Sequence, residues 1–265
     1  MEMSSTKLFL CYCLFLILFF NPNPARSHNF SFHFPSFNLT NHLTLLGDSY
    51  LENGALFLSR WSQVPSSRSG SALYKNPIRF FHKDANVAAS FSTRFTFMIE
   101  SVNPPSSGAG FCFFLSPYSH SLESPGGFLG LMDSSSQTST KNRFVAVEFD
   151  TVQDLQFDDP DDNHVGLDID TIVSVKTTPT AMLGDINLKS GFTITAWIDY
   201  QSCKKKLEVF LNYDTPKPRT PVMVVDIDLS GYLHEFMFVG FSASTEESTE
   251  LHVIENWSFH TFGDF

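Results

Sequence analysis

The chain has 265 residues, a formal net charge of −11 at pH 7 and a pI of about 5.1. This surplus of negative charge argues against nucleic acid or an anionic membrane as the main partner. The length suffices for one large domain with a substantial core, and 29 Phe residues supply aromatic side chains to fill it.

Residues 1–27 are predicted to form a secretory signal peptide. Lys7 precedes an apolar run from Leu8 to Phe20, and Ala25-Arg26-Ser27 offers small residues at a cleavage site. An uncleaved membrane anchor is the alternative, but a spanning helix needs about 20 apolar residues and this run is shorter. We therefore expect a mature, secreted domain of residues 28–265.

The cysteines do not predict a disulfide framework. Cys11 and Cys13 lie in the signal peptide, Cys112 lies in an apolar strand, and Cys203 lies in a Lys-rich turn. Three sequons for N-glycosylation begin at Asn29, Asn38 and Asn256. They fit a secreted glycoprotein, although the last one falls in a predicted strand and is expected to be poorly accessible.

Apolar and polar residues alternate along most of the remaining chain, which is typical of β-strands, and no stretch is typical of a helix. The main predicted strands cover residues 30–34, 49–52, 55–58, 91–99, 145–150, 165–173, 192–200, 207–211, 222–227, 236–242 and 251–259. Asn53-Gly54 predicts a tight hairpin turn. Many short strands with frequent turns and an aromatic core indicate an all-β sandwich without a second domain.

The segment from Val145 to Ser174 carries the chemistry. In the strand 145–150, Glu148 and Asp150 point to the same face as Ala146, about 6.6 Å apart along the strand. The residues that follow form an acidic turn that ends in an imidazole: Asp154, Asp158, Asp159, Asp161, Asp162 and His164. So much like charge predicts a compensating cation, although a solvated acidic loop is the alternative.

Two kinds of ion suit this set of donors. Carboxylates with one imidazole suit a transition ion such as Mn²⁺, whereas oxygen ligands alone suit Ca²⁺. Glu148 and His164 fit the manganese side, and Asp150 and Asp159 are placed to bridge both ions. The candidate ligands are thus Glu148, Asp150, Val152 through its carbonyl, Asp154, Asp159 and His164.

The spacing of Glu148-x-Asp150, Asp159-Pro160 and His164-Val165-Gly166 resembles the metal-binding signature of legume-type (L-type) lectins, the concanavalin A family. The similarity covers nearly the whole mature chain, and it extends in particular to the extracellular domains of plant L-type lectin receptor kinases. It implies a concanavalin A-like jelly-roll sandwich with a flat back sheet and a curved front sheet. It also implies bound Ca²⁺ and Mn²⁺, with Ser174 holding a metal-bound water.

The expected sugar site departs from the family pattern. The resemblance implies an Asp in an Ala-Asp-Gly segment, a Gly in a second loop and an Asn that also binds calcium. Here these positions hold Ala109, Gly127 and Asp154, and a fourth loop offers Thr245, Glu246 and Glu247. A lost charged acceptor costs about 1.5–3 kcal/mol, against only about −4 kcal/mol for millimolar binding. We therefore expect metal binding to be retained and simple-sugar affinity to be weak or absent.

Three classes of function follow from these observations. The first is binding of glycans, such as extended cell-wall oligosaccharides, at the cell surface or in the apoplast. The second is a non-sugar module that binds a protein, peptide or hydrophobic ligand in extracellular signalling or plant defence. The third is a glycan hydrolase, which is disfavoured because Val152 and Gln153 hold the positions where related enzymes place a further catalytic carboxylate. Because the sequence stops at Phe265, shortly after the last predicted strand, we expect a free extracellular lectin-like protein without the membrane helix and kinase of the receptor kinases. The resemblance implies a homodimer through the back sheet.

Overall fold

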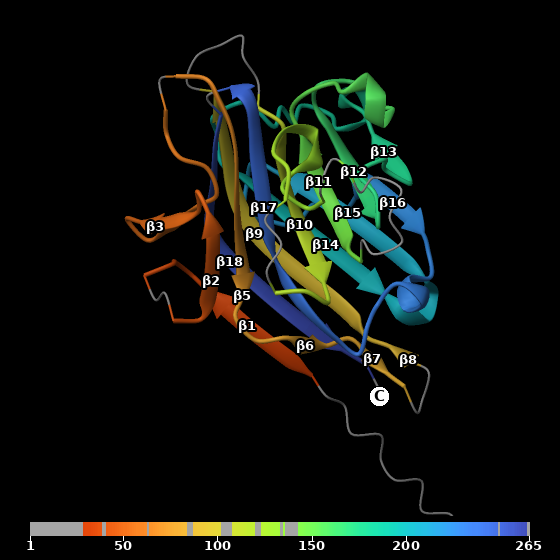
Figure 1. The fold of residues 1–265 in the computed structure, drawn as a ribbon. Coiled ribbons are helices and arrows are strands. Elements are labelled where there is room, and N and C mark those ends of the chain that lie inside the picture. The colour runs from red at the N-terminus through yellow and green to blue at the C-terminus, as the bar shows by residue number, and fades with distance from the viewer. Residues whose placement is uncertain are drawn as a thin grey trace, which may run out of the picture.

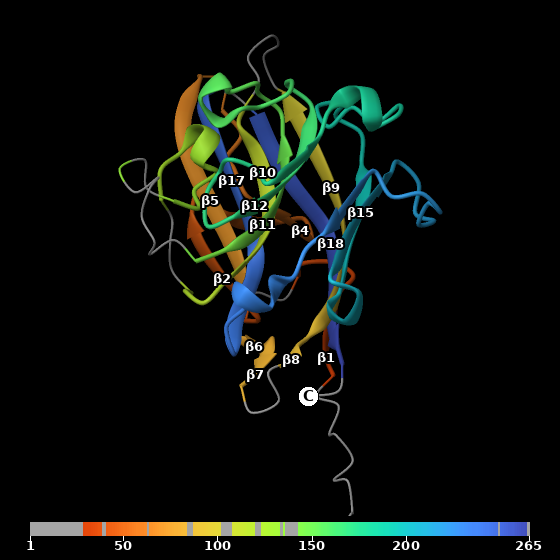
Figure 2. The same cartoon turned by 90° about the vertical axis from the view of Figure 1, so that its right-hand side faces the viewer.

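The computed structural model describes residues 29–38, 41–62, 64–83, 87–101, 108–119, 123–132, 135, 143–248 and 250–263. The predicted signal peptide lies outside these residues. Within them the chain folds into two antiparallel sheets packed face to face, and Figure 2 shows the two layers from the side. The predicted β-sandwich is therefore confirmed.

The back sheet has eight strands. In spatial order they are β16 (Met223–Asp226), β15 (Lys206–Asn212), β14 (Ile194–Gln201), β9 (Ser90–Ser101), β18 (Glu250–Phe262), β4 (Ala55–Phe57) and β3 (Tyr50–Glu52), with β1 (Phe30–Phe34) also paired to β18. The predicted hairpin at Asn53-Gly54 joins β3 to β4, and both turn residues have positive φ, 50° and 79°. That conformation is the one for which Asn and Gly are preferred in a two-residue hairpin loop.

The front sheet also has eight strands. In spatial order they are β13 (Lys176–Thr178), β12 (His164–Ile169), β11 (Val145–Asp150), β10 (Gly110–Ser116), β17 (Phe236–Ser248), β5 (Ser66–Tyr74) and β2 (Leu43–Gly47), with β6 (Ile78–Arg79) also paired to β17. Figure 1 shows β10, β11 and β12 side by side, as their pairing requires. A small third sheet pairs β7 (Phe81–His82) with β8 (Val87–Ala88).

The helices that the structure describes are all single 3₁₀ turns, in agreement with the absence of predicted helices. They cover Gly126–Phe128, Leu155–Phe157, Thr180–Met182, Ser202–Lys204 and Leu229–Gly231. None of the helices in the described part of the chain is long and apolar enough to cross a membrane. Among the described residues, Cys112 is a buried free thiol and Cys203 is an exposed one.

The core between the sheets is mainly aromatic. Phe95 and Phe97 of β9 contact the front sheet, with ring centroids 4.9 Å from Phe241 and 4.8 Å from Phe111 respectively. Trp257 of β18 lies 4.8 Å from Phe241, and its indole N–H donates to the hydroxyl of Thr93 at 3.0 Å. Edge-to-face pairs of this kind add to the area that they bury, so the Phe-rich composition holds the two layers together.

Three predicted elements need correction. The strand predicted at 192–200 begins only at Ile194, and Phe192 is 70% exposed. The run predicted at 165–173 ends at Ile169, because Asp170 adopts a positive φ of 57° and its carboxylate accepts from the backbone N–H of Phe144. The fourth loop, predicted at 245–249, is instead strand, since β17 continues to Ser248 through a bulge against β5.

Two Phe-to-Ala substitutions test the assignment of core and surface. Phe95→Ala should lower the free energy of unfolding by about 3–5 kcal/mol, because it leaves a cavity where a fully buried ring stood. Phe192→Ala should change it by less than about 0.5 kcal/mol, because the side chain already faces solvent. Urea unfolding monitored by Trp fluorescence measures both values. Equal losses at the two positions would contradict the assignment.

Candidate functional site

The candidate site begins on β11, whose side chains alternate between two environments. Val147 and Phe149 enter the core between the sheets, whereas Ala146 lies in a second apolar cluster on the other face of the front sheet. Glu148 and Asp150 share the face of Ala146, as predicted, and both are buried. Two carboxylates are thus fixed on one rigid strand, away from bulk water.

The register between β11 and β12 brings the imidazole to these carboxylates. Asp150 is paired with His164, and Glu148 is paired with Gly166. A Cβ atom at Gly166 would lie 2.1 Å from both Glu148 Oε1 and Ser174 Oγ, so only glycine leaves room for these two groups. The His-Val-Gly motif therefore supplies one donor and the space for another.

His164 is completely buried and directs one ring nitrogen at the acids. Its Nδ1 donates to the carbonyl of Asp161 at 2.8 Å, which leaves Nε2 facing the carboxylates. The Nε2 atom lies 3.5 Å from Glu148 Oε1 and 3.6 Å from Asp159 Oδ1, yet it has no hydrogen-bond partner among the described residues. A buried ring nitrogen that faces carboxylates without a hydrogen bond, while the other ring nitrogen donates to a carbonyl, is the arrangement expected of a metal ligand.

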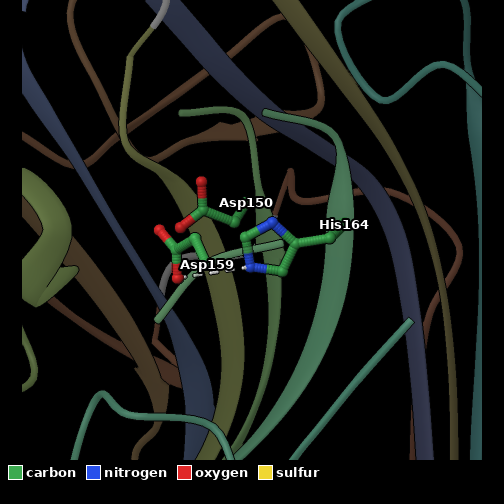
Figure 3. A group of neighbouring side chains, drawn as sticks. All are labelled: Asp150, Asp159 and His164. Carbon is green, nitrogen blue, oxygen red and sulfur yellow. Dashed lines mark ion pairs between the residues drawn. The ribbon is translucent and has the colours of Figure 1, made fainter. Parts of the chain in front are cut away.

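Asp159 comes from the turn after β11 and closes the group. One ligand atom from each of Asp150, Asp159 and His164 lies within 4.8 Å of the others, and Figure 3 shows the three side chains converging. The backbone N–H of Val152 donates to Asp150 Oδ1 and that of Asp154 donates to Asp159 Oδ2, both at 2.7 Å. These bonds orient the carboxylates toward the shared space.

The pKa values reflect this crowding. Burial and the neighbouring Glu148 raise the pKa of Asp150 well above its usual range, and burial raises the pKa of Asp159 to about 6. Burial alone would lower the pKa of His164, but Glu148, Asp150 and Asp159 outweigh it and raise this pKa to about 9. Protons therefore compensate the negative charge when no other cation does.

Asp168 belongs to the same cluster and was missed by the sequence analysis. It is fully buried, burial and Glu148 raise its pKa well above the usual range, and its Oδ2 lacks a hydrogen-bond partner among the described residues. The Ser174 hydroxyl lies 2.8 Å from Glu148 Oε1 and 2.5 Å from Asp168 Oδ1. A hydroxyl has only one proton, so a proton on Asp168 completes this arrangement. The available signal was alternation, which places Asp168 on the face of His164 and Gly166 in β12.

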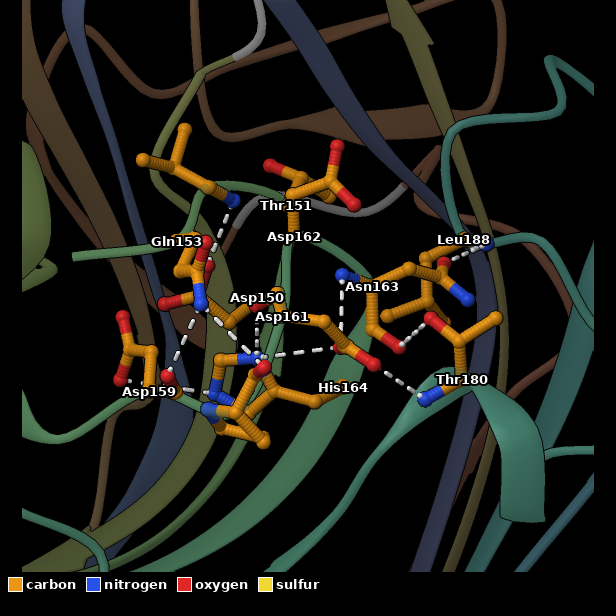
Figure 4. A network of polar contacts seen from close by, with 12 residues as sticks. Asp150, Thr151, Gln153, Asp159, Asp161, Asp162, Asn163, His164, Thr180 and Leu188 are labelled. Carbon is orange, nitrogen blue, oxygen red and sulfur yellow. Dashed lines mark hydrogen bonds and ion pairs between the residues drawn. The ribbon is translucent and has the colours of Figure 1, made fainter. Parts of the chain in front are cut away.

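Two other acids of the turn, Asp161 and Asp162, have structural partners, and Figure 4 shows the contacts of Asp161. Asp161 accepts from the backbone N–H groups of Asn163 and Thr180. The carboxylate of Asp162 accepts from Lys189 Nζ at 2.8 Å. These contacts tie the turn to the segment that follows β13, so neither acid is available to the buried group.

The residues predicted to contact a ligand lie in or beside the loops of the front sheet. They differ in whether they are neighbours of one another and in whether they are buried. A Cβ at Gly127 would lie 2.9 Å from Asp154 Oδ2, so these two predicted residues are neighbours. A Cβ at Gly126 would lie 2.6 Å from Glu246 Oε2, so the second loop lies beside the end of β17. Ala109, in contrast, is only 2% exposed and lies in the second apolar cluster.

Two residues of the predicted fourth loop differ in availability. Thr245 is buried, and its hydroxyl donates to the carbonyl of Ser66 at 2.7 Å, which is a strand contact. Glu247 is exposed, adopts a positive φ of 46° and receives no ion pair among the described residues. The exposed acids at the end of β17, and not the threonine, are therefore placed to meet a ligand.

The three predicted glycosylation positions also differ. Asn29 and Asn38 are exposed. Asn256 lies within β18 and is partly buried, and its side-chain oxygen accepts from Arg94 Nη1 at 3.0 Å and from Thr96 Oγ1 at 3.3 Å. Its carboxamide is thus already engaged on the outer face of the back sheet.

Comparison with known proteins identifies the family of the chain. The model of the legume lectin domain matches residues 29–264. The chain belongs to the legume lectin family. It is 50% identical over 246 residues to the probable L-type lectin-domain containing receptor kinase S.7 of Arabidopsis thaliana, a match that covers 90% of this chain and 36% of that protein. The chain thus spans about a third of the length of this relative.

Solved legume lectins share the fold. Lectin I-B4 of Griffonia simplicifolia, in its metal-free form, superposes with a TM-score of 0.77 at 32% identity, covering 88% of this chain and 99% of that one. Basic winged bean lectin, solved with Tn-antigen, gives 0.76 at 30% identity, covering 88% and 98%. The sandwich is therefore the concanavalin A-like jelly roll that was predicted. Legume lectin domains are carbohydrate-binding modules without enzymatic activity.

The stability of the metal-free lectin domain should depend on the pH through His164. Folding raises the pKa of the imidazole from 6.5 to about 9. The protonated imidazole therefore stabilises the folded state fully below pH 6.5, and this contribution is lost as the pH rises through 9. His164→Gln cannot gain this charge, so the difference in thermal midpoint between the wild type and the variant should shrink over that range. Differential scanning calorimetry in chelator measures it. Parallel curves for the two proteins would contradict the expectation.

Proposed function

We propose that this lectin domain is a secreted, extracellular glycan-binding module that depends on bound Ca²⁺ and Mn²⁺. The observation that carries the proposal is the buried group of Glu148, Asp150, Asp159 and His164, with the unused Nε2 of the imidazole directed at the acids. Hard carboxylate donors with one imidazole are the set that manganese and calcium take together. The secretory leader that the sequence predicts at residues 1–27 and the similarity to receptor kinases support an extracellular, apoplastic location.

We propose that the donors would divide between the two ions as the sequence analysis predicts. Glu148 and His164 would hold manganese, and Asp150 and Asp159 would be shared by both ions. The calcium side would be completed by the carbonyl of Val152 and the side chain of Asp154. Ser174 would act through a water, and its hydroxyl contact with Glu148 supports a role in orienting that ligand. The ions would fix the loops above the front sheet and neutralise the buried acids.

The ligand is proposed to be an extended glycan, such as a cell-wall oligosaccharide, and not a free monosaccharide. Ala109 has no carboxylate, and Asp154 has no amide to donate to a sugar hydroxyl. Gly127, Asp154 and Glu246 nevertheless bring the loops together at one place. A longer glycan reaches further contacts around that place, which offset the weak primary site.

One observation favours a second candidate, a peptide or other apolar ligand. Leu155 lies directly after Asp154 and is 76% exposed, which is unusual for a leucine beside a proposed binding site. Exposed apolar side chains next to a recognition loop are typical of sites for proteins or hydrophobic ligands. The dependence of binding on metal and on glycan distinguishes the two candidates.

Metal binding is tested by a matched pair of Asp-to-Asn substitutions. Asp150→Asn should weaken Mn²⁺ and Ca²⁺ binding more than about tenfold, since changes behind the ligands alone cost about 10–100-fold. Asp158→Asn should leave both affinities unchanged, because Asp158 is exposed and its positive φ of 64° suits Asn. Isothermal titration of chelator-treated protein with each ion gives the affinities. Unchanged binding by Asp150→Asn would refute the site.

Glycan recognition is tested on an array of plant cell-wall oligosaccharides, with and without chelator. We expect metal-dependent retention of extended glycans, and monosaccharide affinities weaker than about 1 mM, because that affinity represents only about −4 kcal/mol and two polar contacts are missing. Sub-millimolar binding of a simple sugar would contradict the weak primary site. Binding that is insensitive to chelator and to glycan would favour the second candidate.

A further inference from the structure

A second buried polar cluster lies behind the loops, apart from the proposed metal ligands. It consists of Ser59, Thr151, Glu250 and His252, each 5% exposed or less. His252 Nε2 donates to Glu250 Oε2 at 3.0 Å, and Ser59 Oγ lies 3.0 Å from His252 Nδ1. Thr151 Oγ1 lies 2.8 Å from the same Glu250 oxygen. The carboxylate of Glu250 thus accepts hydrogen bonds both from His252 of its own strand, β18, and from Thr151, the residue that follows β11.

This cluster contacts the segment that leads into β10. The Thr151 hydroxyl lies 3.1 Å from the carbonyl of Gly108, in addition to its contact with Glu250. A Cβ atom at Gly108 would lie 2.4 Å from Glu250 Oε2 and 2.6 Å from its Cβ. Glu250 therefore occupies the space beside Gly108 and requires glycine there. The Gly108-Ala109 segment contains no acid, and the side chain of Glu250 packs against its backbone.

The same cluster contacts the metal-binding turn through Thr151. This residue stands between two proposed ligands, Asp150 and Val152, so its position sets theirs. Its backbone carbonyl accepts from Lys189 Nζ at 3.1 Å, and the same ammonium donates to Asp162 Oδ2 at 2.8 Å. Thr151 is therefore held from both sides, by Glu250 through its side chain and by Lys189 through its backbone.

Glu250 is kept charged in this interior position. Burial by itself raises the pKa of Glu250, but the hydrogen bond and charge of His252, the Thr151 hydroxyl and the N–H of Gly108 outweigh burial and hold it below the usual range. Its Oε1 has no hydrogen-bond partner among the described residues. A buried carboxylate is a poor source of stability compared with apolar packing, so its presence points to a role in fixing one arrangement.

We propose that Glu250 and Thr151 are positioning residues for the metal site, which they join to the ligand loop at Gly108. They hold the backbone between Asp150 and Val152 in the geometry that the ions need, and they hold the Gly108-Ala109 segment against it. This inference rests on the proposed metal-dependent function. It adds two residues that do not touch the ions and that set how tightly the ions bind.

The test is a pair of size-preserving variants of the full chain, Thr151→Val and Glu250→Gln, titrated with Mn²⁺ alone and with Ca²⁺ alone. Each should weaken ion binding by about 10–100-fold, as for other groups that orient metal ligands. Thr151→Ser keeps the hydroxyl and should restore binding. The matched control is Thr93→Val, since Thr93 is also buried and its hydroxyl bonds to Trp257 and Ser258 on the back sheet. It should lower the thermal midpoint without changing ion affinity.

A double-mutant cycle separates positioning from general destabilisation. Because Thr151 and Glu250 are in contact, the losses of affinity in the double variant should be smaller than the sum of the single losses. If the wild type binds the ions and the ion affinities of the variants lie within about twofold of the wild-type value, this inference is overturned and the proposed function stands. A wild type that binds neither ion would overturn the proposed function and this inference with it. If Thr151→Val does not fold, Glu250→Gln with its Thr93→Val control decides the question.

Discussion

The site depends on the burial of negative charge. Glu148, Asp150 and Asp159 face one imidazole, and Asp168 interacts with Glu148, in a sheet that carries an apolar cluster on each face. An isolated carboxylate in such an environment is very unfavourable, so these groups must share protons or bind a cation. The raised pKa values are the metal-free solution to this problem. The proposed ions are the alternative solution, in which metal charge takes the place of protons.

The fold supplies the geometry that this solution requires. The antiparallel register sets Asp150 opposite His164 and Glu148 opposite Gly166, so two strands provide the donors and the space between them. Strands in the middle of a sheet move little, which suits a site that needs fixed distances. The turn that brings in Asp159 is less regular, and it is held by backbone N–H groups and by the contacts to Lys189.

Thr151 connects this cluster to a second one. On one side of it lie the proposed metal ligands, and on the other lies the buried pair of Glu250 and His252. Gly108, at the start of the segment with the missing family Asp, contacts the second cluster. In the proposed function, one hydroxyl and one carboxylate would link metal binding to the shape of the ligand loops.

The sequence by itself determined the all-β class, most strands, the hairpin at Asn53-Gly54 and the shared face of Glu148 and Asp150. These follow from local rules, since side chains alternate along a strand and certain turns favour Asn and Gly. Spacing also identified Asp159 and His164 as partners of that face, through the resemblance to legume lectins.

Only the tertiary structure decided which residues complete the site. Glu250 and Thr245 carry no local signal that distinguishes a buried residue from an exposed one. Alternation places Asp168 on the face of His164 but does not show that it is buried. The exposure of Phe192 and the strand at 245–248 depended on where the neighbouring strands end. Burial and pairing between distant segments are properties of the packed sheets, because a residue's environment is set by strands that lie far from it in the chain. For that reason the chemistry could be predicted from one segment, whereas the residues that hold it in place could not.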